Sequence, residues 1–218
     1  MISLWSRRAV FSPANLSNLA AWFRYGQGIT ETGAGVSQWD DASGNTRHLK
    51  QGTDTNRPAK QGDGSILFDG ADNFLKCDAF TLNQPFTVYL LAKQVTWTSG
   101  DYLFDGNTTN SALLRQRTSS PRLGLFAGTV ADVADTTWTL DTYMPVAVVF
   151  DGASSVLQIN NGVSNTVNPG AQNAAGFTLG SAPAATNPAN IQVKEVVIYA
   201  AAHDASTRAQ VNAYLATL

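Results

Sequence analysis

The feature that most constrains the fold is a long succession of short segments rich in Val, Ile, Leu, Phe and Thr, each bounded by Gly, Asn, Asp, Ser or Pro. Such segments are typical of strands, and the residues between them are typical of turns. This pattern predicts an all-β fold of the sandwich type. We expect strands over residues 65–68, 86–93, 102–104, 112–116, 122–126, 145–150, 156–159, 177–179 and 193–199.

The strands differ in how their apolar residues are spaced. Residues 157–160 alternate between apolar and polar side chains, which predicts a strand that is buried on one face. Residues 146–150 and 196–199 are apolar without interruption, so we expect either that both faces of these strands are covered or that the strands lie in the middle of the sandwich. Asn161 and Gly162 follow the alternating strand and are expected to supply the positive φ angles of a tight hairpin turn.

The C-terminal segment departs from the strand pattern. Asp204 or Ser206 can cap a short helix there. One face of this helix carries apolar side chains at helical spacing, namely Val211, Tyr214, Leu215 and Leu218. We expect the helix to pack on the sandwich through this stripe.

Composition limits the classes of partner. The 218 residues suit a single β-sandwich domain, and only 14% of them are charged, against roughly 25% in an average soluble domain. The net charge of −2 gives no basic surface for nucleic acid, and no apolar run is long enough to span a membrane. Arg7 and Arg8 are not followed by a continuous apolar stretch, so we expect no signal peptide.

Several motifs occur in an order that carries a family resemblance. Residues 36–75 hold an aromatic-acidic strand end (Trp39-Asp40-Asp41), a Ser-Gly-Asn turn (43–45) and a strand that closes on Phe-Asp-Gly (68–70). Downstream come FTVYLLA (86–92), VAVVFDG (146–152), FTLGS (177–181) and VKEVVIY (193–199). Together they resemble the laminin-G-like, concanavalin-type jelly-roll domains of bacteria and bacteriophages. The resemblance implies a sandwich of two antiparallel sheets over residues 17–218.

Residues 1–16 precede the recognisable domain and form an N-terminal arm. The arm carries several large apolar side chains, of which Leu4, Trp5, Val10 and Phe11 are the expected docking residues. Apolar arms either fold back on their own domain or dock onto a neighbouring chain. Both alternatives stay open from the sequence.

The concanavalin-type fold that the resemblance implies includes glycoside hydrolases and lyases. Retaining glycosidases need two carboxyl groups about 5–5.5 Å apart. The only glutamates are Glu31 and Glu195, and neither has an acidic partner at the spacing of the hydrolase relatives. His48 and His203 are expected to be solvated or hydrogen-bonded loop residues, and Cys77 a small buried side chain rather than a nucleophile. We therefore expect no enzymatic activity.

Clustered oxygen ligands suggest a calcium site. Asp41 and Asn45 flank a glycine turn, and Asp72 lies in a second acidic turn. Calcium prefers such hard oxygen ligands, and several laminin-G relatives bind it at one rim of the sandwich. The alternative is that these side chains cap their own turns through hydrogen bonds to the backbone.

A glycan site requires an aromatic platform for the sugar ring and planar polar groups for its hydroxyls. The segment between residues 97 and 138 is rich in both. The candidates are Trp97, Tyr102, Asp105, Asn107, Arg115, Arg117 and Trp138. Arg115 and Arg117 are expected on one face of a strand because side chains alternate. For Trp97 and Trp138, packing in the core or at the rim is the open alternative.

Two functions fit these observations. The first is a non-enzymatic virion protein, made in the host cytoplasm, that decorates a capsid, forms a head fibre or spike, or belongs to a tail. Its arm would dock onto other virion proteins or copies of itself, and its jelly roll would contact cell-surface polysaccharide. The alternative is a stand-alone bacterial carbohydrate-binding module.

Overall fold

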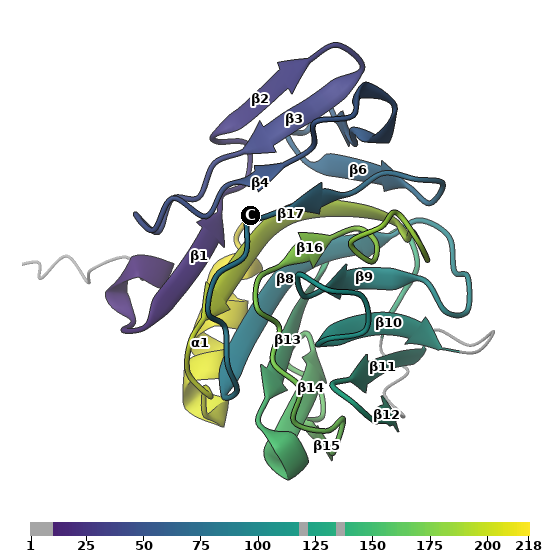
Figure 1. Ribbon diagram of the computed structural model, residues 1–218. Helices are drawn as coiled ribbons and strands as arrows, with labels where there is room; N and C mark the ends of the chain where they lie inside the picture. The colour runs from purple at the N-terminus through teal and green to yellow at the C-terminus, as the bar shows by residue number, and fades with distance from the viewer. Residues whose placement is uncertain (1–10, 118–121, 134–137) are drawn as a thin grey trace, which may run out of the picture.

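The computed structural model describes residues 11–117, 122–133 and 138–218, which form two antiparallel sheets packed face to face (Figure 1). Sheet A runs in the order β15 (Asn165–Val167), β14 (Ser155–Ile159), β13 (Met144–Phe150), β8 (Phe86–Gln94), β17 (Asn190–Tyr199), β6 (Ile66–Asp69) and β5 (Ala59–Lys60), and β1 (Leu19–Phe23) also pairs with β17. Strand β17 therefore holds three neighbours together at the centre of sheet A.

Sheet B runs in the order β12 (Val130–Asp132), β11 (Arg122–Phe126), β10 (Leu113–Arg117), β9 (Tyr102–Asp105), β16 (Thr178–Leu179), β7 (Leu75–Lys76), β4 (Leu49–Lys50), β3 (Gly35–Trp39) and β2 (Ile29–Thr32). Every strand expected from the sequence is present within a few residues of its predicted bounds. The two sheets and the C-terminal helix confirm the predicted fold class.

The main core lies between the sheets and is rich in aromatic rings. Phe86 and Phe150 stack with ring centres 4.8 Å apart, and the ring centre of Phe104 lies 5.3 Å from that of Phe177. Each of these side chains is at most 1% exposed. Burying one such side chain stabilises the fold by about 1.5–3 kcal/mol.

A second apolar layer covers the outer face of sheet A. Helix α1 (Ala205–Leu215) lies across this face, and its Val211 and Leu215 join Tyr89 and Val197 of the sheet in one buried cluster (Figure 1). This layer explains why the central strands of sheet A are apolar on both faces. No helix in the described ranges is long and apolar enough to cross a membrane.

The predicted cap begins this helix. The Asp204 carboxylate accepts a hydrogen bond from the Thr207 amide at 2.7 Å. Asp204 is therefore the cap, and Ser206 lies inside the first turn.

The chain enters the domain beside this helix. Phe11 is partly buried, and its ring centre lies 5.9 Å from that of Tyr214. Phe11 therefore packs on its own domain. Leu4, Trp5 and Val10, the other expected docking residues, lie outside the described residues, and the domain boundary after residue 16 stays a prediction.

The hairpin after β14 differs from expectation. Asn160 takes a positive φ angle, 56°, whereas Asn161 and Gly162 do not. The connection to β15 spans residues 160–164, and the Gly162 amide donates to the Ile159 carbonyl within it. The turn is longer than the two-residue hairpin expected, so the positive φ angle falls at its first residue.

Candidate functional site

The predicted arginine pair lies on the outer face of sheet B. Leu114 of β10 is part of the core between the sheets, so Arg115 and Arg117 point to the opposite side. Arg115 stands opposite Tyr102 on β9 and opposite Gly124 on β11. The pair therefore shares one face, as the alternation of side chains predicts.

Arg117 is neutralised by an acidic neighbour. Its guanidinium donates to the Asp132 carboxylate of β12 at 3.0 Å, across the intervening strand β11. Gly124 leaves room for this crossing, because a Cβ atom there would lie 2.7 Å from Cγ of Arg117. The side chain of Arg117 thus lies flat across the sheet.

Arg115 stands in a less polar setting. None of the ion pairs in the described ranges includes it. Its side chain is half-buried and stands opposite Tyr102, and its Nε atom is buried and has no hydrogen-bond partner among the described residues. Burial raises the pKa of Tyr102, so its hydroxyl keeps its proton at neutral pH.

The aromatic candidates offer less ring surface than expected. Trp138 is 1% exposed and packs in the main core, so the expectation that it stacks on a sugar is wrong. Tyr102 is 7% exposed, and its hydroxyl donates to Oδ1 of Asn110 at 2.7 Å. Trp97 is half-buried against the core and donates from Nε1 to the Arg117 carbonyl at 3.1 Å.

The Asp105 carboxylate stabilises a loop of the fold instead of facing a ligand. It is fully buried, and its carboxylate accepts hydrogen bonds from the backbone amides of Gly106, Asn110 and Ser111 at 2.7–3.1 Å. Burial raises the pKa of Asp105, whereas these amides act in the opposite direction. The expectation that Asp105 contacts a glycan is therefore wrong. Asn107, two residues on, keeps a buried Oδ1 atom without a partner in the described part of the chain.

The acidic turn around Asp41 is held by its own hydrogen bonds. The Asp41 carboxylate accepts from the amides of Trp22, Ser43 and Arg47 at 2.8–3.0 Å and from the Ser43 hydroxyl at 2.8 Å. Asn45 donates to the Ala20 carbonyl at 3.0 Å. These contacts correspond to the turn-capping alternative.

Asp72 stands in a different setting. Its backbone carbonyl accepts from the Asn56 side-chain amide at 3.1 Å, and its carboxylate accepts from the Asn73 side chain at 3.3 Å. No group of three or more His, Cys, Asp or Glu side chains suited to a metal ion occurs in the described part of the chain. The contacts of Asp72 thus also hold a turn.

A pocket that the sequence did not reveal lies between two connections that cross from one sheet to the other. One connection joins β7 to β8, and the second joins β15 to β16. The pocket has a volume of about 330 Å³ and is lined by Ala79, Phe80, Thr81, Asn83 and Ala175. We call it the loop pocket.

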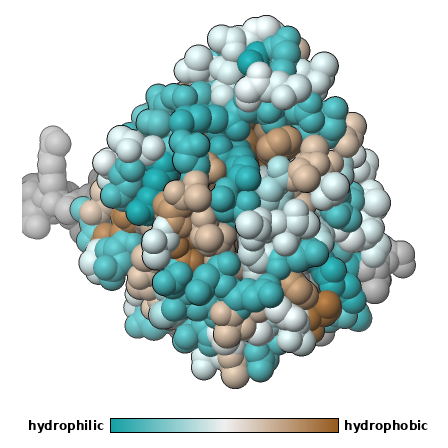
Figure 2. Space-filling view, in the orientation of Figure 1, coloured by the Kyte–Doolittle hydropathy of each residue, from teal (hydrophilic) through white to brown (hydrophobic). Residues whose placement is uncertain are grey.

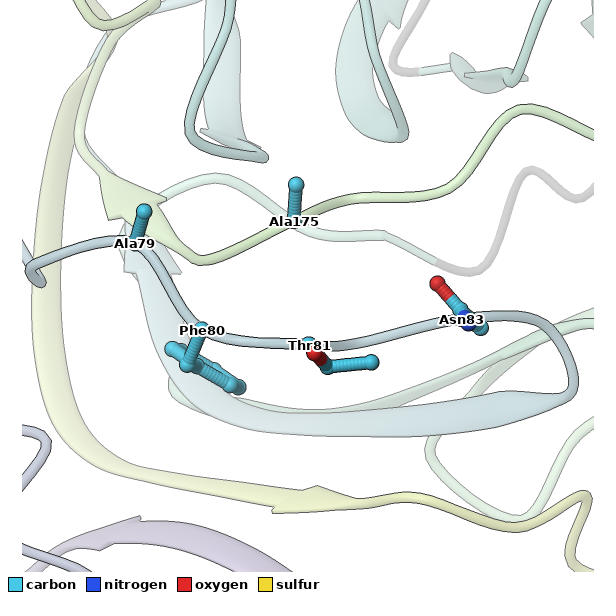
Figure 3. Close-up of a pocket in the computed structure, with 5 residues that line it drawn as sticks. All are labelled: Ala79, Phe80, Thr81, Asn83 and Ala175. Atoms are coloured by element: carbon cyan, nitrogen blue, oxygen red, sulfur yellow. The ribbon is translucent and has the colours of Figure 1, made fainter.

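The close-up of the loop pocket shows how its side chains are arranged. In Figure 3, Ala79 and Ala175 extend in the same direction from neighbouring segments, while the Phe80 ring lies on the other side of its segment. The Thr81 and Asn83 side chains are exposed. The pocket therefore combines small apolar groups with polar groups that solvent can reach.

Backbone hydrogen bonds join the two segments that form this pocket. The Phe80 amide donates to the Ala175 carbonyl at 3.3 Å, and the Ala174 amide donates to the Leu82 carbonyl at 3.1 Å. The Gln84 amide donates to Oδ1 of Asn173 at 2.9 Å. These contacts hold the pocket in shape before any ligand arrives.

Phe80 is fixed from one side by a cation. The guanidinium of Arg47 lies 4.1 Å from the centre of the Phe80 ring. Such contacts stabilise by about 0.5–1 kcal/mol at exposed sites. The ring also packs against the main core, so it borders the pocket as a fixed apolar wall.

The two glutamates lie in different sheets. Glu31 is exposed on β2, and its carboxylate lies 3.7 Å from Nζ of Lys60. Glu195 is 1% exposed on β17 and accepts hydrogen bonds from Nε1 of Trp22 at 2.7 Å and from the Tyr214 hydroxyl at 2.6 Å. They therefore form no pair of catalytic carboxyl groups.

The remaining reactive side chains are also engaged in packing. Burial raises the pKa of Cys77 to about 12, so its thiol stays protonated at neutral pH. His48 accepts a hydrogen bond from the Asp41 amide at 3.1 Å, and His203 bonds the Tyr89 hydroxyl at 2.7 Å. The expectations of a buried cysteine and of hydrogen-bonded histidines are confirmed.

The surface is mostly hydrophilic in the view of Figure 2, with a few separate hydrophobic patches. The exposed large apolar side chains in the described ranges are Val130, Leu140 and Val163. Val130 lies on β12, whereas Leu140 and Val163 lie in two separate connections between strands. The surface is thus suited to polar ligands rather than to an extensive apolar contact.

No protein-family model matches the chain, and no curated protein matches it. Solved structures do match. A sialidase from Trypanosoma rangeli in complex with sialic acid has a TM-score of 0.67 and 14% identity, over 93% of this chain and 33% of that chain. The chain therefore spans about a third of the length of these sialidases.

Two further matches are structures of single domains. Domain 4 of AbnA, a GH43 extracellular arabinanase from Geobacillus stearothermophilus, in complex with arabinotriose, has a TM-score of 0.65 and 16% identity over 89% of this chain and 98% of that chain. The binding domain of Paraclostridial Mosquitocidal Protein 1 has a TM-score of 0.62 and 15% identity, over 93% of this chain and 53% of that chain. At these identities the likeness shows the fold alone, which is a sandwich of two antiparallel β-sheets.

Proposed function

We propose that this chain is a non-catalytic carbohydrate-binding domain and that the loop pocket receives a sugar ring. The observation that carries the proposal is the pocket itself. Its volume of about 330 Å³ lies at the lower end of the range for small-ligand sites, and its walls are joined by backbone hydrogen bonds. A preformed pocket binds with little loss of conformational entropy.

The lining suits the two kinds of surface that a sugar presents. Ala79, Ala175 and Phe80 offer apolar contact to the C–H groups of the ring. Thr81 and Asn83 carry a hydroxyl and an amide, which together donate and accept hydrogen bonds. We infer that these two side chains orient the sugar hydroxyls.

The structural neighbours support the same interpretation. Domain 4 of AbnA was solved with arabinotriose and matches this chain over nearly its whole length. The sialidases are enzymes, but the matched region is only a third of each. A binding role is favoured over a catalytic one because Glu31 and Glu195 lie in different sheets.

Calorimetric titration of the full chain with arabinotriose, xylotetraose and maltotetraose tests the proposal. We expect at least one of them to bind with a dissociation constant of about 1 mM or tighter, equivalent to about 4 kcal/mol. Ala79→Trp should abolish binding by filling the pocket, and Asn83→Ala should weaken it. Thr166→Ala, an exposed residue on β15, is the matched control.

Two results would contradict this function. One is the release of shorter oligosaccharides on prolonged incubation, which would indicate catalysis. The other is sugar binding that persists unchanged in Ala79→Trp, which would move the site elsewhere. The folding of each variant is checked by its melting temperature.

A finer proposal concerns the setting in which the domain works. We infer a virion surface protein, with a bacterial carbohydrate-binding module as the alternative. The support is compositional, since a surface with only 14% charged residues in the chain packs against neighbours with little loss of hydration. Light scattering after size exclusion tests it: self-association that disappears on deletion of residues 2–10 supports assembly, and a monomer supports the module.

A further inference from the structure

Cationic side chains gather on the outer face of sheet B. Leu49 and Leu75 point into the core, so the residues that follow them point outward and pair across β4 and β7. Further along the sheet the same face carries three arginines of β10 and β11. We call these five residues the basic face, and they are Lys50, Lys76, Arg115, Arg117 and Arg122. The basic face stands out in a chain whose net charge is −2.

Two members of the basic face are neutralised by neighbours. Nζ of Lys50 lies 3.0 Å from the Asp78 carboxylate, and Arg117 is paired with Asp132. The other three form no ion pair with any described residue. Positive charge is therefore left over on this face.

Arg115 is the member best placed to bind a ligand. It is half-buried, whereas Arg122 is exposed, so its guanidinium has already lost part of its hydration. Its buried Nε atom lacks a hydrogen-bond partner in the described ranges, and leaving such a donor unsatisfied is unfavourable. The part of the Arg115 side chain that remains exposed is where an acceptor from a ligand would bind.

We propose that the basic face binds the anionic groups of an acidic polysaccharide, with Arg115 as the principal contact. The inference rests on the proposed function, that the chain binds glycans, and it assigns the class of glycan. Carboxylates and sulfate esters both match the donor geometry of a guanidinium. Tyr102 stands opposite Arg115 on the neighbouring strand, so the guanidinium has an aromatic residue beside it on the same face.

An acidic glycan fits this face better than nucleic acid. Nucleic acids carry closely spaced phosphates and favour proteins with a strong basic excess. Here two of the five cations are paired with aspartates, and the chain as a whole is acidic. A few free cations suffice to pair with single carboxylate or sulfate groups of a glycan, but they fall short of the strong basic excess that nucleic acid favours.

Binding of the full chain to immobilised polymers tests the inference. The probes are polygalacturonate for carboxylates, dextran sulfate for sulfate esters, unmodified dextran as the neutral polymer, and single-stranded DNA. We expect at least one of the two acidic polysaccharides to bind about tenfold more tightly than dextran. Binding should weaken as sodium chloride rises from about 50 to about 300 mM, because salt screens exposed charges.

Variants locate the contact. Arg115→Gln should lower the affinity for the preferred acidic polymer about tenfold, and Arg115→Lys should recover only part of it, because lysine lacks the planar fork. Lys60→Gln removes the same charge from an exposed position on β5 of the other sheet and should leave binding unchanged. Equal melting temperatures of the variants exclude loss of fold as the cause.

The outcomes separate this inference from the proposed function. Acidic binding that depends on Arg115 supports the inference even if Ala79→Trp has no effect on arabinotriose or the other neutral sugars. Neutral sugars that bind while acidic polymers bind no better than dextran would overturn the inference and leave the proposed function standing. Equal loss in Arg115→Gln and Lys60→Gln, or tighter binding to DNA than to either acidic polysaccharide, would also overturn it.

Discussion

The two outer faces of the sandwich differ in what covers them. The outer face of sheet A lies under helix α1 and the segment around Phe11, and its Tyr89 and Val197 are fully buried. The outer face of sheet B instead carries charged side chains such as Arg115 and Arg117. The first face therefore stabilises the fold. Among the described residues, the second is covered only where Tyr102, Leu113 and Ala182 form a small buried cluster, and it is the face that we propose meets an acidic glycan.

The buried arginine of sheet A and Arg115 of sheet B show a similar contrast. On sheet A, the buried Arg208 guanidinium donates to Gln158, Ser164 and the His203 carbonyl at 2.9–3.1 Å. On sheet B, Nε of Arg115 is buried without a partner among the described residues. A satisfied buried group stabilises the fold, whereas an unsatisfied one points to a ligand or to strain. Substitutions on the outer face of sheet A should therefore change stability, and substitutions on the outer face of sheet B should change binding.

Leu215→Ala should produce the largest effect. The side chain is fully buried between α1 and sheet A, so we expect a loss of about 3 kcal/mol in the free energy of unfolding. Lys76→Ala on the outer face of sheet B is the control and should change stability by less than about 0.5 kcal/mol. Urea unfolding followed by tryptophan fluorescence measures both. Similar losses in the two variants would remove the contrast between the faces.

Tyr214→Phe should have an intermediate effect. It removes the 2.6 Å hydrogen bond from the Tyr214 hydroxyl to the buried Glu195 carboxylate. Hydrogen bonds to charged groups contribute about 1.5–3 kcal/mol, and Trp22 continues to donate to Glu195, so we expect a loss near the lower value. Tyr143→Phe, whose hydroxyl bonds Gln192 and the exposed Asp63, should lose less. A larger loss of unfolding free energy in Tyr143→Phe than in Tyr214→Phe, measured by urea unfolding, would contradict this account of the hydrogen bonds around Glu195.

Acidification should weaken the covered face through His203. Burial lowers the pKa of His203 below the ordinary value of 6.5, while Asp204 acts in the opposite direction. The unfolded chain therefore binds a proton at a higher pH than the folded chain does. The stabilisation that neutral His203 contributes is fully present above 6.5, the pKa of the residue in the unfolded chain. It is lost as the pH falls from 6.5 through the lower pKa of His203 in the folded chain.

The measurement is the melting temperature across this range for the unaltered chain and for His203→Asn. We expect the difference between the two to shrink as the pH falls, because the variant lacks the titrating group. A difference that stays constant with pH would show that the pKa of His203 is the same in the folded and unfolded states. Arg115→Gln on sheet B serves as the control, because it should leave the pH dependence of the melting temperature unchanged.

The sequence predicts the fold better than the site. Uninterrupted apolar residues at 146–150 correctly indicate a strand covered on both faces, and Asp204 correctly indicates the start of the helix. Alternation also places Arg115 and Arg117 on one face. These features depend on neighbours in the sequence, which is why local patterns suffice.

The predictions about site residues that were wrong concern contacts between residues that are distant in the sequence. Trp138 lies among threonines and looks exposed, yet the sheets enclose it. Asp105 looks like a ligand, yet a loop folds over its carboxylate. The loop pocket joins residues 79–83 to Ala175, and no local pattern links segments so far apart. An aromatic residue beside Thr and Asn, at residues 80–83, is the one signal that could have directed attention there.

Asp132→Asn should have the smallest effect on stability and a distinct effect on binding. Its ion pair with Arg117 is largely exposed, so breaking it should change the free energy of unfolding by at most about 1 kcal/mol. The change frees a guanidinium two residues from Arg115 on the same face. Affinity for polygalacturonate or dextran sulfate should therefore rise by a factor of about 2–5, because the local positive charge increases.

Asp78→Asn is the matched control, because it frees Lys50 at the other end of the basic face with the same change in net charge. If Arg115 is the principal contact, freeing Arg117 beside it should strengthen binding more than freeing the distant Lys50, because Coulomb attraction falls with distance and is screened by salt. Equal gains in the two variants would indicate diffuse attraction to the whole sheet. No gain in Asp132→Asn would show that the face near Arg117 does not meet the polymer, and the division between a stabilising face and a binding face would then fail at its binding half.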